Sequence, residues 1–215
     1  MNSTRKSVRG IPALQSLEPR RMLAGNVTVT YDPDTGFYGT LSITGDNKAN
    51  QFIIAVGSRD TTIRGLNGTT VNGFSGGSIN TLPDLVIDTG NGDDDVEIVD
   101  PFSAITVRTG NGNDRVKIAD DASFIILFDT FDIDTGNGDD HVEIWNVNTF
   151  DADMNIRMGN GNDTLRLLGS LEIRGDALID MGQGSDTIDE KFLFDFDATG
   201  TITIVNNETV LPPLI

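Results

Sequence analysis

The sequence predicts an all-β fold, a right-handed parallel β-helix or β-solenoid of about seven rungs with a cap at each end. Three observations predict it. One segment recurs five times, apolar and polar side chains alternate on both sides of each recurrence, and the 215 residues include 24 glycines beside many Asn, Asp, Val, Ile and Thr. A unit of strand, glycine turn and strand cannot bury its apolar side alone, so neighbouring units must stack.

The five copies begin at offsets of 20, 26, 23 and 23 residues along the chain. They read LVIDTGNGDDDVEI from Leu85, ITVRTGNGNDRVKI from Ile105, FDIDTGNGDDHVEI from Phe131, MNIRMGNGNDTLRL from Met154 and ALIDMGQGSDTIDE from Ala177. Upstream, LSITGDNKANQFII from Leu41 keeps the nine-residue step between Ile43 and Phe52 but lacks the turn glycines, and it predicts a rung without the site. A weaker rung is predicted at 62–68.

These copies define the predicted domain organisation. The strand positions that should stack are Ile43, Ile63, Ile87, Val107, Ile133, Ile156 and Ile179. At roughly 4.8 Å per rung, seven stacked rungs would extend over about 30 Å, which is the length of a compact domain. We expect a basic export segment at 1–25, an N-terminal cap with degenerate rungs at 26–84, the repeat solenoid at 85–190 and a C-terminal cap at 191–215.

Alternation assigns the faces of each strand, with Leu85, Ile87, Val96 and Ile98 and their equivalents pointing inward. Two outward columns alternate in charge. They read Asp88, Arg108, Asp134, Arg157, Asp180, and Glu97, Lys117, Glu143, Arg166, Asp189. In a parallel, in-register stack such residues lie above one another, where opposite charges stabilise by roughly 0.2–1 kcal/mol. The alternation therefore supports in-register stacking.

A third column, at the turns, does not alternate. It consists of Asp94, Asp114, Asp140, Asp163 and Asp186, which we call the Asp column. Neighbouring carboxylates about 5 Å apart repel by roughly 3 kcal/mol at an effective dielectric near 20, so a bound cation is expected between successive turns. Glycines at the turns can adopt positive φ and direct carbonyls toward such an ion, and calcium takes carboxylate and carbonyl oxygens more readily than magnesium does.

The predicted metal site therefore combines the Asp column with its turn glycines. These are Gly90, Gly92, Asp94, Gly110, Gly112, Asp114, Gly136, Gly138, Asp140, Gly159, Gly161, Asp163, Gly182, Gly184 and Asp186. The alternative is an ion-free edge. In it, stacked amides satisfy one another and the aspartates cap turn amides. The amide column would contain Asn47, Asn67, Asn91, Asn111, Asn137, Asn160 and Gln183.

The turn TGNGDDDVE at Thr89–Glu97 resembles the hemolysin-type calcium-binding nonapeptide of RTX proteins, G-G-x-G-x-D-x-U-x. The resemblance implies calcium bound by the aspartate and turn carbonyls, with the U residue in the core. This chain departs at the first glycine, which is replaced by Thr89, Thr109, Thr135, Met158 and Met181. It also carries the motif once per rung rather than twice, so ions are expected on one edge.

Composition excludes several classes of protein. The 33 acidic and 15 basic residues give a net charge of −18, which disfavours binding to nucleic acid. The absence of cysteine and the single histidine exclude disulfides, zinc–thiolate sites and multi-histidine centres within the chain. No segment approaches the roughly 20 apolar residues of a transmembrane helix.

The basic start of the chain carries a second resemblance. Leu17–Leu23, LEPRRML, resembles the LEPR-x-LL segment that opens many large exported or surface proteins of certain bacteria. The resemblance implies export, with processing near Leu23 to Gly25. The alternative is a disordered basic tail. Secretion or a cell-surface location also fits weak calcium sites, which fill outside cells.

From these observations we expect a calcium-stabilised structural or adhesive module of the cell surface or extracellular space, not an enzyme, with surface polysaccharide or surface proteins as partners. His141 is expected to be solvent-facing and Trp145 to be a packing residue. A polysaccharide-active, lyase-like enzyme on a β-helix scaffold is the alternative. A minor alternative is an ice-binding ladder built on Thr89, Thr109 and Thr135.

Overall fold

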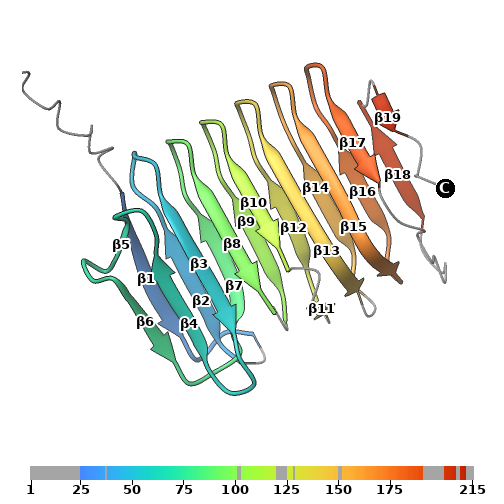
Figure 1. Cartoon of the computed structure of the whole chain (residues 1–215). Helices are drawn as coiled ribbons and strands as arrows, with labels where there is room; N and C mark the ends of the chain where they lie inside the picture. Colours follow the sequence, from blue (N-terminus) through green and yellow to red (C-terminus); the bar gives the residue numbers. More distant parts are fainter. Residues whose placement is uncertain are drawn as a thin grey trace, which may run out of the picture.

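The computed structural model describes residues 25–36, 38–100, 103–119, 125–127, 129–149, 152–190, 201–206 and 209–211. They form an all-β β-solenoid of about four turns with stacked Asn and Asp ladders. The strands lie side by side in a row, and the N-terminal and C-terminal strands are at opposite ends of it (Figure 1). In the regular part, four backbone bridges join successive loops from Asn91 to Gln183.

Two sheets make up the solenoid. The first has the strand order β18-β16-β14-β12-β9-β7-β2-β1-β5. Its strands are β1 (Asn26–Asp32), β2 (Thr40–Thr44), β5 (Thr70–Val71), β7 (Asp84–Asp88), β9 (Ile105–Arg108), β12 (Phe131–Asp134), β14 (Met154–Arg157), β16 (Ala177–Asp180) and β18 (Ile202–Val205).

The second sheet has the order β19-β17-β15-β13-β10-β8-β3-β4-β6, with β11 paired to β13 beside this path. Its strands are β3 (Gln51–Val56), β4 (Thr61–Gly65), β6 (Gly76–Ile79), β8 (Asp95–Val99), β10 (Arg115–Ile118), β11 (Ile125–Leu127), β13 (His141–Thr149), β15 (Thr164–Ile173), β17 (Thr187–Glu190) and β19 (Thr209–Leu211).

The predicted parallel register is confirmed for the five copies. In the first sheet, the paired positions run through Ile87, Val107, Ile133, Ile156 and Ile179. In the second, they run through Val96, Val116, Val142, Leu165 and Ile188. Each offset between successive copies is therefore one turn of the solenoid.

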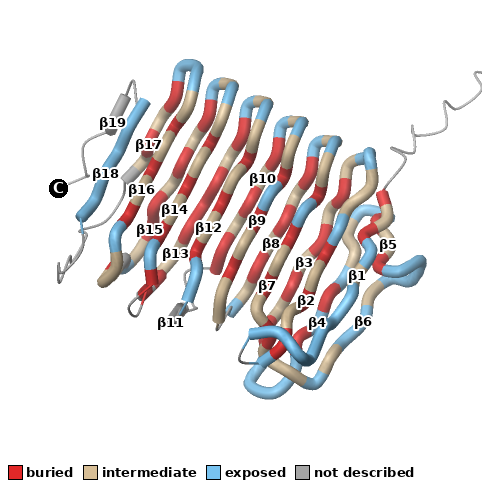
Figure 2. The backbone as a smooth tube through the Cα atoms, turned by 180° about the vertical axis from the view of Figure 1, so that it is seen from behind, coloured by how far each residue is buried: buried red, intermediate tan, exposed pale blue. Residues whose placement is uncertain are grey.

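The predicted core is also confirmed. Leu85, Ile87, Val96 and Ile98 are 0–2% exposed, and their apolar equivalents in the other four copies are buried with them. Buried and partly buried positions alternate along the regular strands, as in β3, β8 and β10, whereas the tight loops are exposed at their tips (Figure 2). The core is thus one apolar layer between the two sheets.

The second charged column pairs as predicted. Lys117 Nζ lies 3.0 Å from Glu97 Oε1. Arg166 contacts both of its vertical neighbours, Glu143 at 2.8 Å and Asp189 at 3.2 Å. Opposite charges in adjacent turns are therefore in direct contact along this face.

The first charged column has the predicted register, but its arginines pair differently. Arg108 and Arg157 reach Asp132, at 3.6 Å and 3.0 Å, from the turns before and after it. Asp132 lies two residues before Asp134 on the same strand face, so a long guanidinium side chain can reach it diagonally. One carboxylate therefore links two arginines.

The rung predicted at Ile63 is wrong. Gly57 N–H donates to Asp60 O at 2.7 Å, and this tight turn sends β4 back antiparallel to β3. As a result Ile63 is paired with Ile54, and Asn67 Nδ2 donates to Gln51 instead of joining the amide column.

The two ends of the stack are built differently. At the N-terminal end, β1 is antiparallel to β2, and β6 is antiparallel to β4. At the C-terminal end, β18 and β19 continue the parallel stacking on β16 and β17. The predicted export segment lies outside the described residues except for Gly25, and so do 191–200 of the predicted C-terminal cap.

Candidate functional site

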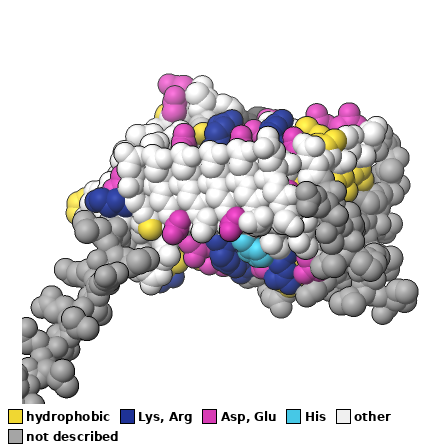
Figure 3. All heavy atoms as spheres, turned by 90° about the horizontal axis from the view of Figure 1, so that it is seen from above, with side chains coloured by type: hydrophobic (Ala, Val, Ile, Leu, Met, Phe, Trp, Pro, Cys, Tyr) yellow, Lys and Arg dark blue, Asp and Glu magenta, His cyan; other side chains and the backbone are white. Residues whose placement is uncertain are grey.

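The predicted site residues all lie on one edge of the solenoid, at the loops 89–94, 109–114, 135–140, 158–163 and 181–186. We call this the loop edge. Its backbone is continuous from turn to turn through the bridges Asn91↔Asn111, Asn111↔Asn137, Asn137↔Asn160 and Asn160↔Gln183. Seen from above, the edge is a mostly uncharged band flanked by charged side chains (Figure 3).

Both turn glycines of every copy have positive φ, between 84° and 146°, as predicted. The second reason for glycine is the close approach of the next loop. A Cβ on Gly112 would lie 1.9 Å from the carbonyl oxygen of Gly92, and one on Gly110 would lie 2.0 Å from that of Gly90. Both the backbone conformation and the stacking distance therefore require glycine.

The carbonyls of the first turn glycines are used within the protein. Asn111 N–H donates to Gly90 O at 2.9 Å, and Asn137 N–H donates to Gly110 O at 2.8 Å. The next two turns repeat this bond at 2.8 Å and 2.7 Å, from Asn160 to Gly136 and from Gln183 to Gly159. These carbonyls hold the loops together, so they do not all converge on a shared ion.

The amide column is present on the exposed side of the loop edge. Each asparagine Nδ2 donates to the Oδ1 of the preceding turn, at 2.7–2.9 Å, through Asn47, Asn91, Asn111, Asn137 and Asn160. Beside it, Asp93 Oδ1 accepts from Asn113 N–H at 2.8 Å, and Asn113 Oδ1 accepts from Asp139 N–H at 2.9 Å. This part of the edge matches the ion-free alternative.

The Asp column lies beneath the amides, and its residues are only 1–2% exposed. Each Oδ1 accepts a hydrogen bond from the backbone N–H of the preceding turn, at 2.7–2.9 Å. The other oxygen, Oδ2, is buried without a hydrogen-bond partner in Asp94, Asp114, Asp140, Asp163 and Asp186. Five carboxyls in succession thus have one satisfied and one unsatisfied oxygen.

Burial raises the pKa of four carboxyls of the Asp column, those of Asp94, Asp114, Asp140 and Asp163, because desolvation penalises the charged form. The pKa of Asp94 and of Asp163 rises to about 6 and that of Asp140 to about 7, and the pKa of Asp114 is also raised. Neighbouring carboxylates add to the rise. Backbone N–H donors oppose it, and so do the hydroxyls of Thr89, Thr109 and Thr135 beside Asp94, Asp114 and Asp140, although these hydroxyls make their hydrogen bonds to backbone carbonyls. A proton or a cation at these carboxyls therefore stabilises the folded column at pH values where an exposed aspartate is already ionised.

The position that departs from the RTX pattern is a core position. Thr89, Thr109 and Thr135 are fully buried, and each hydroxyl donates to the carbonyl oxygen of the next turn, at 2.7–3.2 Å. Met158 and Met181 fill the same position in the last two copies and are also fully buried. These threonine hydroxyls therefore do not form a surface ladder, on which the ice-binding alternative depended.

The fit to calcium comes from the Asp column alone. Among the described residues, no three acidic or histidine side chains gather as a metal centre. Each copy instead offers one buried, partnerless carboxylate oxygen, which is the kind of hard donor that calcium prefers. The chemistry of this donor fits calcium, and the remaining oxygens would come from loop carbonyls or water.

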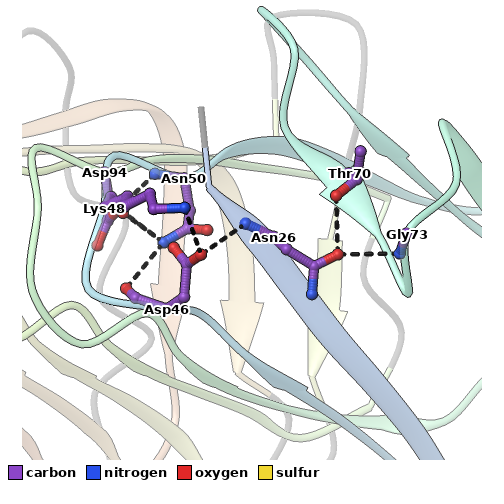
Figure 4. A network of polar contacts seen from close by, with 7 residues as sticks. All are labelled: Asn26, Asp46, Lys48, Asn50, Thr70, Gly73 and Asp94. Carbon is purple, nitrogen blue, oxygen red and sulfur yellow. Dashed lines mark hydrogen bonds and ion pairs between the residues drawn. The ribbon is translucent and has the colours of Figure 1, made fainter. Parts of the chain in front are cut away.

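The degenerate turn between β2 and β3 has polar features that the sequence analysis missed. Asn50 takes the place of the aspartate, and the Oδ1 atoms of Asp46 and Asn50 are buried without a partner (Figure 4). The signal was available, since Asn50 stands two residues before Phe52 as Asp94 stands two before Val96. The equivalence of Asn50 and Asp94 was not recognised because this turn lacks the paired glycines of the five copies.

His141 and Trp145 both contact Glu143. The His141 Nε2 atom lies 3.8 Å from Glu143 Oε2, and the imidazole is 33% exposed, with burial lowering its pKa. Trp145 Nε1–H donates to Glu143 Oε1 at 2.8 Å, and the ring packs against the core. Glu143 is therefore shared between the tryptophan hydrogen bond and the approach of the histidine.

No protein-family model, curated protein or solved structure matches the chain. The structure itself defines the class of protein, which is a β-solenoid with stacked Asn and Asp ladders. Within the described part of the chain, no helix is long and apolar enough to span a membrane.

Replacing Gly112 by Ala is expected to lower the free energy of unfolding by at least about 3 kcal/mol, because the new Cβ would clash with Gly92 O at a φ of 140°. Urea denaturation measures the change. Gly77→Ala is the control, since a Cβ there meets nothing within 4 Å and should change stability by less than about 0.5 kcal/mol. Equal effects would contradict the close stacking of the loops.

In a calcium chelator, the protein is expected to become more stable as the pH falls from about 8 to about 5. The folded Asp140 has a pKa of about 7 against an ordinary 3.8, so the folded chain binds more protons than the unfolded chain between these values. Stability therefore falls as pH rises through this window. Thermal unfolding across pH tests this, and Asp140→Asn should flatten the profile whereas exposed Asp60→Asn should not.

Proposed function

We propose that the protein is an exported, calcium-stabilised β-solenoid that serves as a structural or adhesive module of the cell surface or extracellular space. The observation that carries the proposal is the Asp column. Five buried carboxyls, one per turn, each keep an oxygen without a partner. A solenoid in which stacking alone sufficed would not need this unbalanced charge.

The proposed architecture is a right-handed parallel β-helix of about seven rungs with N- and C-terminal caps. Support for the number comes from the parallel path β2, β7, β9, β12, β14, β16 and β18 in the first sheet. Support for the hand is general, because parallel strands joined by crossovers in one sheet are right-handed in about 98% of cases.

Calcium would supply the positive charge that the column lacks. The Oδ2 atoms of Asp94, Asp114, Asp140, Asp163 and Asp186 would hold it, while their Oδ1 atoms continue to accept backbone hydrogen bonds. Neutralisation removes the repulsion between successive carboxylates and the cost of burying them as anions. Binding energy would then add directly to folding stability.

The extracellular location is supported by the LEPR-x-LL resemblance at Leu17–Leu23, and it fits the proposed calcium binding. Individually weak sites, in the range of about 0.1–1 mM, fill outside cells and remain empty in the cytosol. A chain of net charge −18 would repel itself until calcium is available. Folding would then follow export.

A structural or adhesive role is supported by the regularity of the surface. Polar and charged side chains of the described turns are used in vertical contacts, as in the pairs Arg166–Glu143 and Lys117–Glu97. The loop edge offers a long band of repeated amides to partners such as surface polysaccharides or surface proteins. An enzyme would need an isolated acid–base pair in a groove, and the aspartates of the loop edge instead recur at the same position in every copy.

Thermal unfolding of the full chain with and without about 5 mM calcium tests the metal proposal. We expect calcium, but not magnesium, to raise Tm by about 5–10 °C, because binding at many times Kd adds about 2–3 kcal/mol. Asp140→Asn should reduce the gain, and Asp60→Asn should leave it unchanged. No calcium effect would leave an ion-free ladder.

Fractionation of cells that produce the full chain tests the export proposal. The protein is expected in the surface or extracellular fraction, and replacing Arg20 and Arg21 by Ala should retain it in the cytosol, because these residues belong to the LEPR-x-LL-like segment. The matched control replaces Arg5 and Lys6, which lie outside that segment. Cytosolic recovery of the unchanged chain would refute export.

A further inference from the structure

We propose that the degenerate turn between β2 and β3 binds a hard cation of the calcium class through Asp46 and Asn50. This turn lacks the paired glycines of the other copies, and the sequence predicts no site there. It nevertheless holds two buried side-chain oxygens without hydrogen-bond partners, Asp46 Oδ1 and Asn50 Oδ1.

Asn50 is fully buried, and its orientation is fixed by its amide nitrogen. Nδ2 donates to Lys48 O at 2.6 Å and also contacts Asp46 O and Asp94 Oδ1, each at 3.3 Å. Exchanging the positions of the amide nitrogen and oxygen would place the oxygen against three acceptors. Asn50 Oδ1 must therefore face the other way, toward Asp46 (Figure 4).

The two carboxylate oxygens of Asp46 have different surroundings. Oδ2 accepts a hydrogen bond from Asn26 N–H at 3.1 Å and lies 3.7 Å from Lys48 Nζ. Oδ1 is buried and receives no donor. Lys48 thus partly balances the charge of the Asp46 carboxylate, whereas Oδ1 has no hydrogen-bond donor.

The two open oxygens converge on Gly25. A Cβ built on Gly25 would lie 2.2 Å from Asn50 Oδ1 and 2.6 Å from Asp46 Oδ1. The backbone of Gly25 is fixed there, because its N–H donates to Ala49 O and its carbonyl accepts from Thr70 N–H. Glycine at this position therefore keeps a side chain away from the two oxygens.

A carboxylate oxygen beside an amide oxygen is a donor pair for a hard cation. A water molecule could donate to both oxygens, but it carries no charge. Lys48 Nζ offsets part of the charge of Asp46 from 3.7 Å, whereas Asn50 also contacts a second carboxylate, Asp94, to which its N–H and Nδ2 donate. A cation satisfies both acceptors and reduces this negative charge. Loop carbonyls and water would complete its coordination.

This site deepens the proposed calcium stabilisation, but it uses residues outside the Asp column except for the neighbouring Asp94. It would place an ion at the junction of β1, the first turn and the regular stack. Binding there would hold Gly25 and Asn26 of the N-terminal cap to the solenoid.

Calcium titration of the full chain by isothermal calorimetry tests the proposal, with Asp46→Asn as the variant. The change keeps the shape of the side chain and gives it an amide that can donate to Asn50 Oδ1, so folding should be retained, as circular dichroism can verify. We expect Asp46→Asn to bind one calcium equivalent fewer than the unchanged chain. Asp60→Asn makes the same charge change at an exposed position and should lose none.

The outcomes separate this site from the Asp column. Loss of one equivalent in Asp46→Asn, with or without a loss in Asp140→Asn, supports the site at the degenerate turn. Equal stoichiometry in Asp46→Asn and the unchanged chain would overturn it, even if Asp140→Asn loses calcium and the proposed function stands. A chain that binds no calcium at all would overturn both.

Discussion

The close, in-register contact between successive loops is the constraint on which the rest of the structure depends. Each loop lies so near the one before it that a Cβ on Gly112 or Gly138 would meet the preceding carbonyl oxygen at 1.8–1.9 Å. At this spacing every residue stacks on its equivalent in the next turn. Each position must therefore hold residues that can lie directly against one another. The chemistry of each column follows from that repetition.

The columns of stacked residues differ in how their side chains accommodate one another. Apolar residues stack without difficulty, and asparagines form a ladder because an amide both donates and accepts. On the strand faces, a column alternates in sign, and Arg166 accordingly contacts Glu143 and Asp189 together. Aspartates cannot pair with one another while ionised. In the Asp column, burial raises the pKa of Asp94, Asp114, Asp140 and Asp163, and one oxygen of each carboxyl has no hydrogen-bond donor. That column is the place where protons or ions must enter the energetics.

The register, the core and the amide ladder could be predicted because each depends on residue type repeated at the turn spacing. The antiparallel return of β4 could not, since it depends on the turn from Gly57 to Asp60, whereas Ile63 fits either arrangement. The burial of Thr89 and the pairing of Arg157 with Asp132 were also hidden, because pattern alone does not give side-chain direction or reach. At the candidate site, sequence located the carboxyls but not which of their oxygens is satisfied.

The turns of the solenoid differ in length, and the two edges of the solenoid differ in how well they tolerate insertions. All of the regular turns share the same loop edge, and the difference in length falls on the opposite side, for example between β10 and β12, where β11 adds a short pairing to β13. Insertions there leave the loop ladders intact. The opposite edge is therefore the part of the molecule in which evolution, or an engineer, can diversify sequence and length while the stacking that defines the fold is preserved.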